Sequence, residues 1–275
     1  MTEGVAEIAF GRHEGITRLI HLYQRDPLRV LFPAPAAGDP LLAVLLTTSG
    51  GLVAGDRLDI AVRLAKGAAA HVTASAAEKV YRSLGPTTEI RQSLSVAAGA
   101  TLEFLPLETI LFDGARLRRE TMIELGSDAG FLGGDIVVFG RRARGEGFTT
   151  GFLREVWRVQ RGGRLVWGDA LHLEGDIAGI IDDPACFDGA AAFATMILAP
   201  AGRDPRRFLD CARAIQSAGV TAGVRSGVTA IAGLVIARWL APDAAALRRA
   251  YADLASHLRR EAMGLPLSLP RLWQI

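Results

Sequence analysis

The chain has 275 residues, of which 50% are hydrophobic and 22% are charged, a composition that is typical of globular proteins and excludes a disordered one. Its 31 basic and 29 acidic residues give a formal net charge of +2, and this balance argues against nucleic acid as the main partner. The two cysteines, Cys186 and Cys211, exclude a disulfide framework and a Cys-x-x-Cys metal site.

The N-terminus and the most apolar segment bear on localisation. Residues Met1–Gly4 lack the basic start and apolar run of a signal peptide, so a cytoplasmic protein is predicted. The longest candidate for a membrane span, residues 228–241, is shorter than the roughly 20 apolar residues needed and is interrupted by Arg238. No membrane partner is therefore expected.

In chain order, the first informative feature is the glycine loop, residues 49–57, with Gly50, Gly51, Gly55 and Asp56 between two apolar segments. Its glycines indicate a sharply bent backbone that holds Asp56 in a fixed place. The spacing approaches that of a phosphate-binding loop, but Asp56 follows the last glycine and would repel phosphate, which excludes a nucleotide site.

Alternating apolar and polar residues then predict a series of strands. The expected strands are residues 58–64, 90–96, 102–104, 117–125, 131–139 and 156–159. Glycine or proline separates them, and Arg161–Arg164 reads as a hairpin turn. Since no helix intervenes, an antiparallel or solenoid-like β body over about residues 1–203 is predicted.

The pattern changes to helical in the C-terminal part, about residues 204–275. One helix is expected to start at Asp204-Pro205 and end at Gly219, and a second to start after Asp243 and end at Gly264. Residues 224–240 between them read as one or two strands. The prediction is a mostly β, single-domain protein of residues 1–275 with about two C-terminal α-helices.

A search for catalytic groups gives little. The chain has no Gly-x-Ser-x-Gly elbow and no closely spaced pair among its five histidines. Glu103 and Glu108 could form the acid and base of a carbohydrate-active or other β-rich enzyme, which is the alternative function, although Glu103 is expected to be solvated on a strand. His71 is expected to be a hydrogen-bonded core residue in preference to a metal ligand.

Several separated motifs, in order, resemble the UreD family of urease accessory proteins, also called UreH. They are the glycine loop, Glu78–Ser83, Gly99–Ala115, Gly140–Glu146 and Pro270–Trp273, so the resemblance covers roughly the whole chain. The chain departs from the family at Thr47–Ser49, where Asn-x-Ala is common, and at Gly134-Asp135, where Trp-Glu is common. The second departure puts the role of Asp135 in question.

The resemblance implies a β-rich fold with a pair of helices and a non-catalytic scaffold. Such a protein joins a UreF-like accessory protein and a UreG-like GTPase to apo-urease and supports nickel delivery. No tightly bound cofactor is implied, and a nickel ion would pass only transiently. The candidate residues of a metal route are the acids within the matching motifs: Asp56, Glu108, Asp113, Asp135 and Glu146.

Each of these acids also has a structural interpretation. Asp56 could satisfy backbone N–H groups in an Asx-type turn. Glu108 and Asp113 could cap or pair with Arg116 or Arg118, and Glu146 could form a loop ion pair. These alternatives stay open at the level of sequence.

Four further residues are candidates for partner binding or loop ordering. Lys79, Tyr81 and Arg82 could form a partner surface or order the glycine loop through Asp56. Trp273 lies in an apolar C-terminal tail that either folds back onto the body or anchors a partner. The arginine clusters at residues 116–119 and 141–144 are expected to form a solvated face or an interface.

Overall fold

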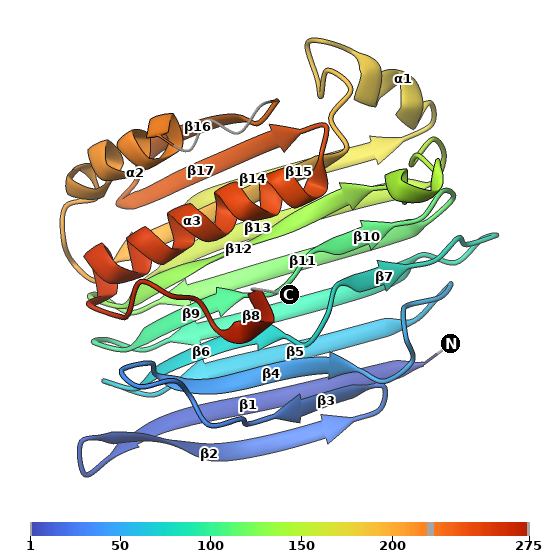
Figure 1. The fold of residues 1–275 in the computed structure, drawn as a ribbon. Helices are drawn as coiled ribbons and strands as arrows, with labels where there is room; N and C mark the ends of the chain where they lie inside the picture. Colours follow the sequence, from blue (N-terminus) through green and yellow to red (C-terminus); the bar gives the residue numbers. More distant parts are fainter. Residues whose placement is uncertain (1, 219–222, 274–275) are drawn as a thin grey trace.

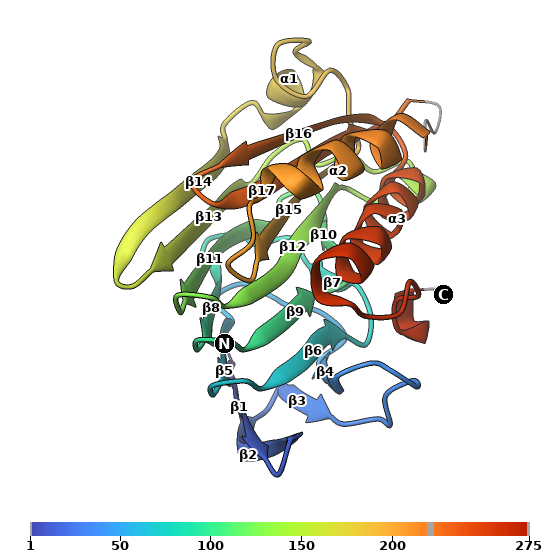
Figure 2. The ribbon, with the colours of Figure 1, turned by 90° about the vertical axis from the view of Figure 1, so that its left-hand side faces the viewer.

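The computed structural model describes residues 2–218 and 223–273, which form two stacked sheets with helices on one side (Figures 1 and 2). Over this part of the chain, sheet A has the strand order β14 (Arg164–Glu174), β13 (Phe152–Arg161), β11 (Arg116–Leu125), β8 (Thr88–Val96), β5 (Arg57–Leu64), β1 (Glu3–His13) and β2 (Ile16–Arg25). Sheet B has the order β16 (Arg225–Ile231), β17 (Leu234–Ala241), β15 (Ala192–Pro200), β12 (Gly130–Phe139), β9 (Thr101–Leu105), β6 (Ala69–Ala74), β4 (Leu41–Thr47) and β3 (Leu28–Leu31). Two short strands, β10 (Thr109–Leu111) and β7 (Glu78–Val80), extend sheet B from β12.

The chain coils between the sheets, and this makes the inner strands parallel. It passes from β5 in sheet A to β6 in sheet B, back to β8, and on through β9, β11, β12 and β13. Neighbouring turns of the coil therefore pair in parallel, as β5 does with β8 and β6 with β9. Antiparallel pairs occur toward the sheet edges, such as β1 with β2 and β13 with β14. The mostly β prediction is confirmed, in its solenoid-like form.

The core lies between the sheets, as the period-2 pattern requires. In β8 and β5 every second side chain is buried, for example Ile60 and Leu94. In β12 every residue is buried, because one face of this strand meets sheet A and the other meets the helices. Phe131 accordingly belongs to the inter-sheet core, and Ile136 belongs to a second apolar cluster under the helices.

Two helices, α2 (Arg206–Ala218) and α3 (Ala244–Met263), cover the outer face of sheet B (Figure 2). Helix α3 begins at Asp243, whose side chain accepts a hydrogen bond from the backbone of Ala245, and ends at Gly264 with φ of 68°. Both helix starts match the prediction, while the predicted end at Gly219 lies outside the described residues. A short helix inside the β body, α1 (Ile177–Asp182), was not predicted, because six residues show too little periodicity. None of the helices described here has the length and apolarity to cross a membrane.

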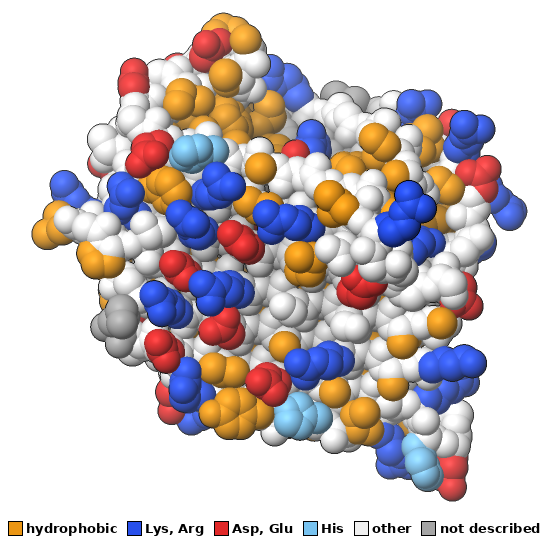
Figure 3. Space-filling view, turned by 180° about the vertical axis from the view of Figure 1, so that it is seen from behind, with side chains coloured by type: hydrophobic (Ala, Val, Ile, Leu, Met, Phe, Trp, Pro, Cys, Tyr) orange, Lys and Arg blue, Asp and Glu red, His pale blue; other side chains and the backbone are white. Residues whose placement is uncertain are grey.

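The outer face of sheet A carries side chains of both charges, interspersed along the strands (Figure 3). Ion pairs cross this face, including Arg91 with Glu89 at 3.0 Å and Arg158 with Glu120 at 3.8 Å. This mixture is the expected form of a solvated face. One arginine of the 116–119 cluster, Arg119, does not follow it and points into the core.

Candidate functional site

Asp56 is the structural centre of the glycine loop. The residue is buried, and its Oδ2 accepts a hydrogen bond from the backbone of Val53 at 3.0 Å. Its Oδ1 accepts from the backbone and hydroxyl of Thr2 at 2.8 and 2.9 Å. The carboxylate thus ties the N-terminus to the start of β5 and accepts from backbone N–H groups as expected, but from Val53 and Thr2 and not in an Asx turn.

The segment after β7 orders the glycine loop by backbone pairing. The backbone N–H of Leu52 donates to Lys79 at 2.7 Å, and that of Tyr81 donates to Leu52 at 2.9 Å. The Tyr81 hydroxyl also donates to the carbonyl of Gly50 at 3.2 Å. Among the described residues, neither Lys79 nor Arg82 has a hydrogen bond or ion pair with Asp56. The expectation that this motif acts through Asp56 is therefore wrong, since it acts through the backbone and the Tyr81 side chain.

A buried acidic cluster surrounds Arg119 between the sheets. Arg119 is 4% exposed and donates from Nε to Oε1 of Glu155 at 2.5 Å and from Nη1 to the hydroxyl of Thr109 at 2.8 Å. Its Nη2 donates to Asp135 of sheet B. Arg119 and Glu155 are direct neighbours across the parallel pair of β11 and β13. The predicted solvated or interface role is wrong for this arginine.

The charges of this cluster do not cancel. Burial, followed by the nearby charge of Glu155, raises the pKa of the Asp135 carboxyl well above its usual range. Burial also raises the pKa of Glu78, which lies close enough to Arg119 for their charges to interact. One guanidinium therefore interacts with three carboxyl groups, and burial favours the neutral form of Asp135. Asp135 Oδ1 and Glu155 Oε2 are buried without a hydrogen-bond partner among the described residues.

A cavity of about 160 Å³ joins this cluster to the glycine loop. Gly50 and Gly51 of the glycine loop line this cavity, and so do Glu78, Thr109 and Arg119. The glycine loop, β7 and Arg119 therefore line one space, in which Glu78 supplies a carboxylate, while Asp135 and Glu155 lie behind Arg119. A hydrated cation could contact carboxylate and carbonyl oxygens there.

None of the five proposed route residues lines this cavity in the described structure, and Glu108 and Asp113 have other partners. Glu108 pairs with Arg248 of α3 at 3.4 Å, and Asp113 accepts hydrogen bonds from the backbones of Thr149 and Thr150 at 2.8 and 3.0 Å. The predicted pairing of both acids with Arg116 or Arg118 is wrong. Burial opposes ionisation of Asp113, but these hydrogen bonds outweigh it and lower its pKa.

Glu146 belongs to the same loop structure as Asp113. Its Oε1 accepts from the backbone of Asp113 at 2.9 Å, and its Oε2 pairs with Arg141. The hydrogen bond from Arg141 lowers the pKa of Glu146. Glu146 is thus in a loop ion pair, and its partner is Arg141 and not the adjacent Arg144.

A second buried network lies on the outer face of sheet B. Glu103 is fully buried, so its expected solvated position is wrong; sheet A covers one face of β9, and α3 with the C-terminal tail covers the other. Its carboxylate accepts from His71 Nδ1 at 2.9 Å and from Arg259 Nε at 2.8 Å. Burial alone would raise the pKa of Glu103, but His71 and Arg259 outweigh it and lower the value to about 2. A group with this pKa is a poor general acid near neutral pH.

The C-terminal tail folds back onto the body as far as it is described. Trp273 is 6% exposed, stacks on Tyr251 with ring centroids 5.6 Å apart, and donates from Nε1 to the carbonyl of Leu105 at 3.3 Å. Within residues 2–218 and 223–273, no three His, Cys, Asp or Glu side chains are grouped as metal ligands.

Sequence reasoning found Asp135 in this site but missed Arg119 and Glu155. A signal for Arg119 was present, because it alternates in step with Leu117, Thr121 and Ile123, which all point into the core. The neighbouring arginines at 116 and 118 obscured that pattern. Glu155 alternates in the same way with Leu153, Trp157 and Val159 of the inter-sheet core, so a comparable signal was present for it as well.

Comparison with known proteins agrees with the motifs. The family model described as UreD urease accessory protein matches residues 2–274. A protein named urease accessory protein UreD from Magnetococcus marinus is 43% identical over 99% of this chain and 94% of its own length. Proteins of the same name from Methylobacterium sp. and Rhodopseudomonas palustris are 45% and 39% identical, over 94% and 98% of this chain and 90% of each relative.

Proposed function

This chain belongs to the UreD urease accessory protein family, which supports a role in urease maturation, and we propose that it acts there as a non-catalytic scaffold. It joins a UreF-like accessory protein and a UreG-like GTPase to apo-urease in the cytoplasm. It also provides a polar passage by which nickel, the cargo, reaches the urease active site.

The buried cluster of Asp135, Glu155 and Arg119 beside the cavity is the observation that carries this proposal. A conduit must release its ion, so carboxylate, carbonyl and water ligands suit it better than thiolates or grouped imidazoles. Asp135 Oδ1 and Glu155 Oε2 are free of hydrogen bonds within the described structure. A passing divalent ion would compete with a proton for the Asp135 carboxyl, whose pKa is raised, so binding there would be readily reversed.

The test is nickel-dependent activation of urease. The chain is co-expressed with UreF-like and UreG-like proteins and apo-urease, and Asp135→Asn is compared with the unchanged protein. Asn keeps an acceptor oxygen for Arg119, but it offers no anionic oxygen to a metal. Activation is expected to fall on the order of tenfold, the range for a metal site that loses a supporting carboxylate.

The control is Asp59→Asn, which changes an exposed aspartate of β5 on the outer face of sheet A. Size-exclusion chromatography reports complex formation for each variant. Loss of activation with Asp135→Asn, an intact complex and normal activation with Asp59→Asn would support the passage. Equal activation by both variants would exclude Asp135 from it, and absence of any complex would contradict the scaffold role.

A further inference from the structure

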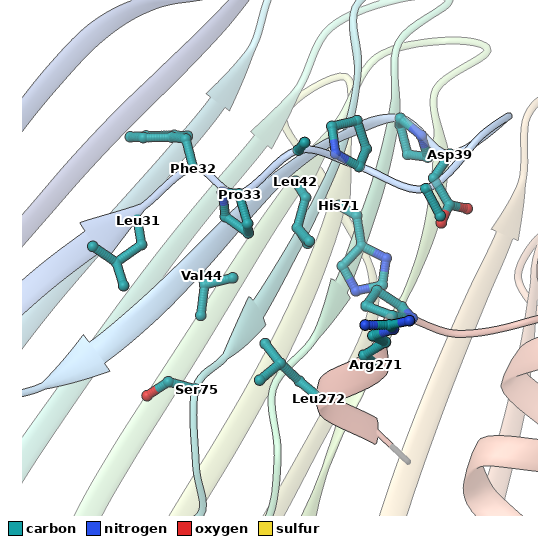
Figure 4. A pocket seen from close by; sticks show the side chains of 15 residues that line it. Leu31, Phe32, Pro33, Asp39, Leu42, Val44, His71, Ser75, Arg271 and Leu272 are labelled. Atoms are coloured by element: carbon teal, nitrogen blue, oxygen red, sulfur yellow. The ribbon is translucent and has the colours of Figure 1, made fainter. Parts of the chain in front are cut away.

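A pocket of about 850 Å³ lies on the outer face of sheet B, beside the part of that face covered by α3. Its floor is formed by Leu42 and Val44 of β4 and by His71 of β6, and Arg271 and Leu272 of the tail close one side (Figure 4). The opposite wall is the segment 31–40, which contributes three prolines. Leu42 and Val44 are buried but belong to neither apolar cluster of the fold.

His71 brings a polar group to this apolar floor. Leu42, His71 and Glu103 are consecutive neighbours across β4, β6 and β9, so their side chains share one face. Glu103 is ionised and can only accept, so His71 Nδ1 carries the proton of their hydrogen bond. The other ring nitrogen, His71 Nε2, has no hydrogen-bond partner among the described residues. His71 is 1% exposed and lines the pocket.

Two carboxylates and two guanidinium groups lie near the pocket. Glu103 from β9 and Asp39 from the 31–40 segment both pair with Arg259 of α3, so two carboxylates share one guanidinium. His71 Nε2 offers an acceptor to the pocket, since Nδ1 carries the proton. Arg271 adds a second positive group, and it has no ion pair within the described part of the chain.

We propose that this pocket binds an apolar peptide segment of a partner protein, holds one carboxylate of that segment at Arg271, and accepts a hydrogen bond from one of its backbone N–H groups at His71 Nε2. The peptide N–H, His71 and Glu103 then form one hydrogen-bonded row. This site is separate from the cavity at Arg119 and does not depend on the proposed passage of nickel.

The shape of the pocket identifies a peptide as the occupant. The pocket is open along a rim where the side chains of Leu31 and Phe32 are 52% and 37% exposed. An extended peptide with apolar side chains would cover this apolar rim, whereas a small ligand inside the pocket would leave it in contact with water. The rim continues from β3, the edge strand of sheet B. The volume is large enough for several side chains, and the positive charge of Arg271 at its end complements an acidic one.

The experiment uses the purified full chain and an array of random octapeptides. Each octapeptide with one Asp or Glu is matched by a version with Asn or Gln, and sodium decanoate serves as a non-peptide carboxylate. The expected result is selection of apolar peptides with a carboxylate, with the matched amides about tenfold weaker, which is the scale of one hydrogen bond to a charged group.

Variants connect the binding to this pocket. Arg271→Gln, on the surface of the tail, is expected to weaken the selected peptides about tenfold, whereas Arg164→Gln on the β13–β14 hairpin leaves them unchanged. Thermal unfolding of each variant shows that it is folded. The proposal is overturned if no peptide is selected, if acids and amides bind equally, if Arg271→Gln has no effect, or if decanoate binds and peptides do not.

Discussion

The buried carboxylate of Glu103 makes stability depend on pH in a calculable way. Its pKa is about 2 in the folded chain against an ordinary 4.5, because His71 and Arg259 outweigh the effect of burial. At about 1.36 kcal/mol per pKa unit, this difference corresponds to about 3 kcal/mol of folding free energy. The folded pKa is the lower one, so the contribution is complete above pH 4.5 and is lost as the pH falls toward 2, with about 2 kcal/mol lost by pH 3.

The perturbation is Glu103→Gln, which removes the titrating group and leaves Arg259 with Asp39 as its remaining carboxylate. Urea unfolding, followed by the fluorescence of the four tryptophans, gives the free energy of unfolding of both proteins at pH 7, 5, 4 and 3. The variant should be less stable at pH 7, and the difference in free energy of unfolding between the two proteins should be about 2 kcal/mol smaller at pH 3. The control, Glu120→Gln on the exposed face of sheet A, should show no such narrowing. A gap for Glu103→Gln that stays constant over this range would refute the reasoning.

Two further predictions concern the glycine loop and the tail. Gly51 has φ of +152°, and a Cβ there would lie 2.6 Å from the Tyr81 ring, so Gly51→Ala should lower the free energy of unfolding by about 1–3 kcal/mol. Gly50 also has a positive φ, but a Cβ there would meet no atom within 4 Å, so Gly50→Ala should lower the free energy of unfolding by less. Equal losses of both variants in urea unfolding would contradict the steric argument. Trp273→Ala removes a buried ring stacked on Tyr251 and should cost about 3 kcal/mol. A loss below about 1 kcal/mol would indicate that the tail is not firmly packed.

The fold was predictable wherever one face of an element meets solvent. Strands β5 and β8 alternate apolar and polar residues because only one side is buried, and α3 shows its start and end at Asp243 and Gly264. The parallel pairing was not predictable, because alternation indicates a strand but not the direction of its neighbour. Strands buried on both faces, such as β15, also lack alternation.

The site was predictable only where the chain folds locally. Asp56 lies within three residues of its partner Val53, so the loop pattern indicated its role in the turn. The Arg119 cluster instead joins β11, β12 and β13, and its members come together only through the register of the two sheets. In the same way Glu103 meets Arg259, which is 156 residues away in the sequence. Nothing local to either residue signals such a contact.

The Arg119 cluster is difficult to explain as a device for stability. Replacing a buried ion pair with apolar side chains of similar volume is often neutral or stabilising, because two charges lose their hydration when they are buried. Here the cost is larger, since three acids surround one arginine and two carboxyl oxygens have no partner within the described structure. In the network of Glu103 and Arg259, in contrast, both carboxylate oxygens accept hydrogen bonds from the guanidinium, and this pair joins β9 to α3. Unbalanced, unsatisfied acids beside a cavity are typical of a functional site, which supports the proposal that this cluster, and not the outer network, contacts the passing ion.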